Sequence, residues 1–183
     1  DGGMLITRDK KTADKAKRIR WFGINRLDKQ KGIWENDITE LGYKYHMNDI
    51  SACIGLASLE EFENIKSHRR LLGKHYIKEL GVLAENILEK SLVLEKFTPW
   101  LITLDTKGHR VELMKHLRGN GVESAQVHYR NDRYSIFKPF VERAFPNMDN
   151  IENNYLVLPL HTKVSEAQVT TICDLIKEFY ANI

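Results

Sequence analysis

The segment MNDISACIGLASLEEFENI, residues 47–65, constrains the fold of this chain more than any other. Asn48 or Asp49 can cap a helix there, because a side-chain oxygen at this position accepts a hydrogen bond from the first helical turn. The next turns are apolar nearly all round, with Ser51 and Ser58 as the polar exceptions, and a helix of that kind is normally buried. We therefore expect its start to pack against a partner surface.

The residues before this helix predict a strand, a helix and a long loop. Two glycines at 2–3 suggest a tight turn into a short buried strand at 4–6. A buried strand needs neighbours, so we expect the chain to begin in the middle of a larger fold. Thr12 can cap a helix that Gly23 closes in a left-handed conformation. Residues 24–46 lack a regular pattern and are too many for a plain connector, and such loops are often functional.

A second unit is expected beyond Gly81. Its pattern predicts, in order, a strand at 100–105, a helix at 110–121, and strands at 122–129 and 156–160. A final helix follows, marked by a capping box of Ser165 and Gln168. Alternating strands and helices are typical of an α/β sandwich in which helices cover one sheet. We place the domain boundary between residues 1–80 and 81–183.

Composition excludes several classes of protein. The 28 basic and 25 acidic residues give a net charge of +3 and are mixed along the chain, which argues against a nucleic-acid-binding surface. No apolar run approaches the length of a membrane span and no leader is visible. Cys53 and Cys173 lie in helical apolar patterns, as buried cysteines do in a reducing compartment. We expect a cytoplasmic protein without a metal site, since its histidines and cysteines lack zinc-site spacing.

The first candidate site is GYKYHMND, residues 42–49, immediately before the apolar helix. A helix N-terminus offers unpaired N–H groups and partial positive charge, and Lys44 adds a full charge, so a phosphate could bind here. Tyr43 and His46 flank that lysine. The alternative is that the tyrosines pack, His46 bonds a carbonyl and Lys44 is solvated.

The second candidate site follows the predicted strand at 122–129. It contains His128, Arg130, Asn131 and Arg133, and two arginines at a strand end can bind a carboxylate or phosphate. The alternative is a polar surface turn.

Six motifs, taken in order, resemble the DegT/DnrJ/EryC1/StrS sugar aminotransferases, which are pyridoxal-phosphate enzymes of fold type I. They are DGGMLIT, RIRWFGI, GYKYHMNDISACIGLASLEEF, NGVESAQVHY, FPNM and LVLPLHTKVSEAQV. They cover nearly the whole chain but only about the last half of a family member. The resemblance implies the end of a large cofactor-binding domain in residues 1–80 and a small C-terminal domain in 81–183.

The resemblance also implies roles for the two candidate sites. In the family, the segment matching Gly42–His46 of one subunit reaches the cofactor phosphate of the other, so Tyr43, Lys44 and His46 become cofactor-binding candidates in a homodimer. Lys44 stands where many members have asparagine, and His46 where arginine is common. The loop with His128, Arg130, Asn131 and Arg133 lines the sugar-nucleotide site in relatives, and the sequence RNDRY departs from their usual prolines.

No catalytic residue is expected within the chain itself. In the family, the lysine that forms the Schiff base with the cofactor precedes the acidic-Gly-Gly turn, which places it upstream of Asp1. We therefore expect the C-terminal part of an aminotransferase that moves an amino group, from glutamate, to a keto-sugar nucleotide, and we expect these 183 residues alone to be inactive. The alternatives are a non-catalytic module that binds a nucleotide sugar or a partner, and a sugar dehydratase of the same fold.

Overall fold

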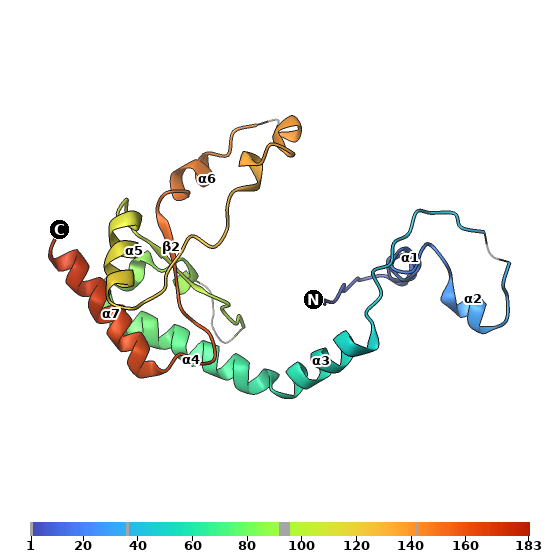
Figure 1. The fold of residues 1–183 in the computed structure, drawn as a ribbon, viewed down its shortest axis with the longest axis horizontal. Helices are drawn as coiled ribbons and strands as arrows, with labels where there is room; N and C mark the ends of the chain where they lie inside the picture. The colour runs from blue at the N-terminus through green and yellow to red at the C-terminus, as the bar shows by residue number, and fades with distance from the viewer. Residues whose placement is uncertain (1, 36, 92–95, 142) are drawn as a thin grey trace. The chain divides into compact units, whose positions relative to one another are not determined.

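The computed structural model describes residues 2–35, 37–91, 96–141 and 143–183 (Figure 1). The chain forms two compact units, Asp1–Phe62 and Glu63–Ile183.

The first unit contains three helices, α1 (Lys10–Ile19), α2 (Arg26–Gln30) and α3 (Asp49–Glu60). The expected cap of α1 at Thr12 is wrong: Asp9 caps this helix, and its carboxylate accepts the backbone N–H of Thr12 at 2.8 Å. The left-handed Gly23 is confirmed at φ 76°. The cap of α3 is Asn48, one of the two residues expected, and its side chain accepts from the N–H of Ser51.

Two expectations of burial in this unit are wrong. Residues 4–6 form no strand, and Met4, Leu5 and Ile6 are 85%, 73% and 84% exposed. A strand needs a neighbouring backbone to satisfy its hydrogen bonds, and no described residue pairs with this segment. The start of α3 is likewise exposed, with Ile50 at 75% and Cys53 also exposed, because no described element of the first unit covers it.

The second unit is larger. Its helices and strands are α4 (Phe62–Leu80), which begins one residue before the unit does, then η1 (Gly81–Asn86), η2 (Leu88–Ser91), β1 (Ile102–Asp105), α5 (Arg110–Gly119), η3 (Asn131–Arg133), η4 (Lys138–Phe140), α6 (Pro146–Ile151), β2 (Tyr155–Leu158) and α7 (Glu166–Ala181).

A two-stranded antiparallel sheet lies at the centre of this unit. Ile102 pairs with Leu158 and Asp105 with Tyr155 at the two ends of the ladder. Helices α4, α5 and α7 lie beside the sheet (Figure 1) and bury their apolar faces in one shared core with it. The core contains, among others, Leu72, Tyr76, Leu80, Leu104, Leu113, Leu117, Leu158, Ile172, Cys173 and Ile176. The expected α/β fold is confirmed.

Some of the elements expected in this unit are confirmed and one expected strand is wrong. The strands expected at 100–105 and 156–160 correspond to β1 and β2, and the capping box of Ser165 and Gln168 is present at α7. The strand expected at 122–129 is wrong: Ala125 alone makes a bridge there, with Val157. Because α4 contributes to the core, the units divide at residue 62, ahead of the boundary expected at 80.

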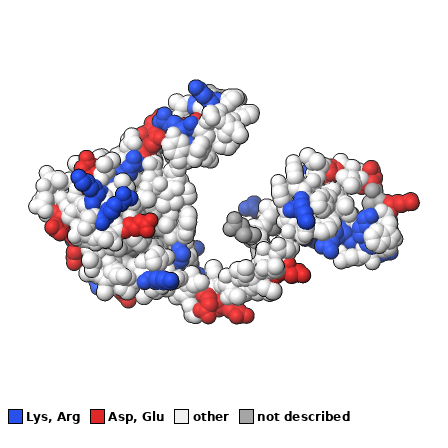
Figure 2. Space-filling view, viewed as in Figure 1, with Lys and Arg blue, Asp and Glu red and all other residues white. Residues whose placement is uncertain are grey.

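Lys/Arg and Asp/Glu atoms are interspersed over the visible surface in Figure 2, as the mixed charge pattern predicts. No helix among the described residues is both long and apolar enough to cross a membrane.

Candidate functional site

The segment that begins at Gly42 is held in the first unit by its backbone. Tyr43 donates its N–H to the carbonyl of Ile19 at 2.7 Å, and Tyr45 donates to Arg20 at 3.0 Å. In return the N–H of Phe22 donates to the carbonyl of Tyr43 at 3.1 Å. The segment is therefore fixed beside the C-terminal end of α1, and its side chains project from a defined backbone.

The side chains of this segment differ in how they are engaged. The rings of Tyr43 and Tyr45 stack with centroids 5.0 Å apart. His46 packs edge-on against Trp21 at 4.1 Å, and its Nδ1 is buried without a hydrogen-bond partner. The ammonium of Lys44 is exposed and makes no hydrogen bond or ion pair within the described part of the chain. One cation thus remains free to bind a ligand.

The N-terminus of α3 follows this segment directly. The side-chain oxygen of Asn48 accepts a hydrogen bond from the N–H of Ser51 at 2.8 Å. The N–H groups of Asp49 and Ile50 belong to the first turn and therefore have no partner within the helix. Those donors and the helix dipole suit a phosphate, and Lys44 lies shortly before them in the sequence, although the carboxylate of Asp49 opposes an anion. The residues present therefore fit the phosphate group of a cofactor.

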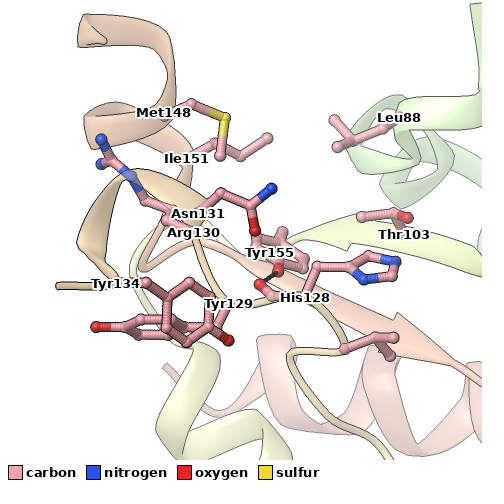
Figure 3. Close-up of a pocket in the computed structure, with 11 residues that line it drawn as sticks. Leu88, Thr103, His128, Tyr129, Arg130, Asn131, Tyr134, Met148, Ile151 and Tyr155 are labelled. Atoms are coloured by element: carbon pink, nitrogen blue, oxygen red, sulfur yellow. Dashed lines mark hydrogen bonds between the residues drawn. The ribbon is translucent and has the colours of Figure 1, made fainter. Parts of the chain in front are cut away.

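The second unit contains a cleft of about 650 Å³ (Figure 3). Its lining is mostly aromatic and apolar, with a few polar side chains: Leu88, Thr103, Val127, His128, Tyr129, Arg130, Asn131, Tyr134, Met148, Ile151 and Tyr155. Tyr129 and Tyr134 meet edge to face at 5.1 Å. The hydroxyl of Tyr155 donates to the carbonyl of His128, which fastens the loop to β2.

Arg130 lies at this cleft with its guanidinium fully engaged by carboxylates. Its side chain is 3% exposed and makes a bidentate pair with Asp132, at 2.9 and 2.6 Å. It also pairs with Asp149 at 2.5 Å and Glu152 at 3.1 Å. The hydrogen bond with Asp132 is the largest of the effects that raise the pKa of the guanidinium above its usual range. The same bond lowers the pKa of the Asp132 carboxyl.

The structure brings the predicted residues together in two groups, one in each unit. Tyr43, Lys44 and His46 lie on one segment of the first unit. In the second unit His128, Arg130 and Asn131 line the cleft, while Arg133 does not line it and pairs with Glu152 at 2.7 Å. The lining residues contributed by η2, α6 and the two strands are not predicted by the sequence pattern, because they are remote in sequence and look like ordinary core residues. They are Leu88, Thr103, Met148, Ile151 and Tyr155.

Within the described residues, no group of three or more histidine, cysteine, aspartate or glutamate side chains is arranged to hold a metal ion.

Comparison with known proteins identifies the family. The sequence model of the DegT/DnrJ/EryC1/StrS aminotransferase family matches residues 1–177. The chain belongs to this family. As a DegT/DnrJ/EryC1/StrS member it is 28% identical to GDP-perosamine synthase of Escherichia coli O157:H7, over 100% of this chain and 48% of that protein.

Solved structures share the fold. CalS13, a sugar aminotransferase from Micromonospora echinospora, matches with a TM-score of 0.81 and 23% identity, over 93% of this chain and 45% of that one. Spr1654 of Streptococcus pneumoniae, solved in a PMP form, matches with a TM-score of 0.75 and 22% identity, over 96% of this chain and 46% of that one. The chain thus spans about half the length of the relatives that it matches.

Proposed function

We propose that the whole protein is a pyridoxal-phosphate-dependent aminotransferase that moves an amino group from glutamate to a keto-sugar nucleotide. The family match over residues 1–177 is the observation that carries this proposal. The perosamine synthase, whose name specifies a GDP-linked amino sugar, supports a nucleotide-sugar substrate. We further propose that these 183 residues supply binding groups to the reaction and that the lysine that reacts with the cofactor lies elsewhere in the protein.

We propose that Lys44 and the N-terminus of α3 bind the cofactor phosphate. Lys44 is an exposed cation for which no partner is found among the described residues, and the first-turn N–H groups of α3 follow it within a few residues of the sequence. When bound, pyridoxal phosphate would carry the amino group and withdraw electrons from the carbon atom to which that group is attached. Tyr43 and His46 keep the backbone around Lys44 in place through their rings. By the family resemblance, the phosphate belongs to the cofactor of a second copy in a homodimer.

We propose that the cleft of the second unit receives the sugar nucleotide. His128 and Asn131 line it and can orient hydroxyl groups by hydrogen bonds, while the tyrosine rings offer faces for stacking. Arg133 lies between the lining residues Asn131 and Tyr134 in the sequence, and its side chain is 48% exposed.

The test uses the full-length protein rather than the 183 residues. Incubation with glutamate and a panel of keto-sugar nucleotides, followed by mass spectrometry, should reveal a product that has gained an amino group. Absence of an aminated product across the panel would refute the proposal, and a product that has lost water instead would indicate the dehydratase. The same assay on the 183 residues should give no turnover.

Lys44→Ala tests the phosphate site separately. Loss of a charged hydrogen bond costs about 1.5–3 kcal/mol, so the affinity for pyridoxal phosphate, followed by its absorbance, should fall by roughly ten- to a hundredfold. Lys31→Ala is the matched control, because Lys31 is an exposed lysine of the same unit. An unchanged affinity in Lys44→Ala would remove Lys44 from the site.

A further inference from the structure

The ion pairs of Arg130 connect three parts of the second unit. Asp132 belongs to η3, Asp149 to α6, and Glu152 follows the end of α6. The loop at 127–134 is thereby joined to α6 through one guanidinium, and both segments contribute side chains to the cleft (Figure 3). If this buried guanidinium bound a ligand instead, its carboxylate partners would be left unpaired, which costs free energy.

Glu152 is a second centre of the same cluster. Its carboxylate accepts from Arg130 at 3.1 Å and from Arg133 at 2.7 Å. Its backbone carbonyl accepts from Arg110 at 2.6 Å and from Gln126 at 3.2 Å. The end of α6 is therefore held against α5 and the start of the cleft loop.

The cluster has an excess of negative charge, which loss of Arg130 would increase. Asp132, Asp149 and Glu152 carry three negative charges, and Arg130 and Arg133 carry two positive charges. Removal of Arg130 leaves three neighbouring carboxylates with Arg133, which is half exposed at 48% and reaches Asp149 only at 3.8 Å. Their mutual repulsion would push the loop away from α6. Removal of Arg133 leaves the buried pairs of Arg130 intact.

We propose that Arg130 is a positioning residue: it holds the 127–134 loop against α6 and so forms the substrate cleft before any ligand arrives. This assignment replaces the direct substrate contact expected for Arg130 from the sequence. It deepens, and for its kinetic test rests on, the proposed function. The Thr103 hydroxyl donates to the carboxylate of Glu89 at 2.7 Å. His128 and Asn131 are lining side chains that no carboxylate engages among the described residues, so we infer that the part of the substrate entering the cleft is an uncharged ring with hydroxyl groups.

Hydrogen exchange of the full-length protein without ligand tests the positioning role. In Arg130→Gln, the peptides covering 127–134 and 146–152 should exchange about tenfold faster or more, because their local opening loses a buried ion-pair cluster. Peptides from β1 and α7 should keep the exchange rates of the parent protein. Arg133→Gln removes one positive charge from the same cluster and is the matched control, with a change below about threefold.

Kinetics give the second readout. A loop that is ordered only part of the time lowers the apparent affinity by the ordered fraction, so the KM for the sugar nucleotide should rise about tenfold in Arg130→Gln while kcat stays within about twofold. Arg130→Lys keeps the charge but not the bidentate geometry, and should give intermediate values for both exchange and KM.

Three results would overturn the proposal. One is unchanged exchange at 127–134 in Arg130→Gln, since the loop would then be held by other contacts. Another is faster exchange throughout β1 and α7, which would make Arg130 a general stabiliser of the unit. The third is a large loss of affinity in Arg130→Lys with parental loop exchange, as a direct substrate contact would produce. Absence of turnover in the parent protein would refute the proposed function alone, because the exchange experiment needs no substrate.

Discussion

Two glycines allow backbone segments of the first unit to touch. A Cβ atom on Gly42 would lie 1.9 Å from the backbone nitrogen of Gly23 and 2.4 Å from the carbonyl carbon of Phe22. A Cβ atom on Gly23 would meet the carbonyl oxygen of Glu40 at 2.4 Å. Neither clash can be relieved by a side-chain rotation, because the atoms belong to the main chain. The placement of Lys44 therefore depends on both glycines.

Gly42→Ala should loosen the segment that carries Lys44. Forcing one methyl group into a filled site costs about 1–3 kcal/mol, so the amides of Phe22, Tyr43 and Tyr45 should exchange about tenfold faster or more. Hydrogen exchange measured by NMR checks this. Gly55→Ala is the control, since no atom of another described element lies within 4 Å of its Cβ position and alanine favours a helix. Equal exchange in Gly42→Ala and the parent would contradict the close approach.

Residue-level signals in the sequence predict some groups of the candidate site and not their partners. The cation at Lys44 follows from residue type and from its position beside a helix start, and the polar side chains of His128 and Asn131 follow from residue type, although the strand expected before them is absent. The pairing of Arg130 with Asp149 and Glu152 does not, because those carboxylates lie 19 and 22 residues away in sequence. Whether an arginine meets a ligand or a carboxylate is decided by the tertiary fold.

At the scale of elements, helix ends were more predictable than strands. Helix caps are local: the side chain of Ser165 accepts from the N–H of Gln168 at 3.2 Å, and Oε1 of Gln168 accepts from the N–H of Ser165 at 2.9 Å. A strand depends on a neighbour that the local sequence does not specify. The apolar run at 4–6 lacks such a neighbour among described residues, whereas β1 and β2 pair although residues 106–154 separate them.

Ser165→Ala should destabilise the second unit through α7. Loss of an N-cap costs about 1 kcal/mol, and α7 buries Val169, Ile172, Cys173 and Ile176 in the core, so the loss should reach the whole unit. The free energy of unfolding, taken from the slowest-exchanging amides of α7, checks this. Ser165→Asp is the control, because aspartate caps a helix as well as serine does and suits its positive end. An equal loss of unfolding free energy in Ser165→Ala and Ser165→Asp would show that the side-chain cap does not stabilise the unit.

At the scale of the whole molecule, α3 is an apolar helix that the other described elements of the first unit leave exposed. Ile50, Ile54, Leu56 and Leu59 are between 63% and 75% exposed, and none of its residues is buried. A helix that is apolar on all sides gains its stability from burial rather than from an amphipathic face. Large apolar surfaces of this kind seldom stay in contact with water.

The 183-residue chain should therefore self-associate through α3 when studied alone. Analytical ultracentrifugation at increasing protein concentration should show species larger than a monomer. Ile54→Lys should weaken this association by roughly ten- to a hundredfold, because burying an isoleucine contributes about 1.5–3 kcal/mol and a lysine cannot replace it. Val82→Lys makes the same chemical change at a residue of η1 that is 88% exposed, and should leave the association as it was. A stable monomer of the parent chain at high concentration, or equal effects of both lysine variants, would mean that α3 is not the surface through which copies meet.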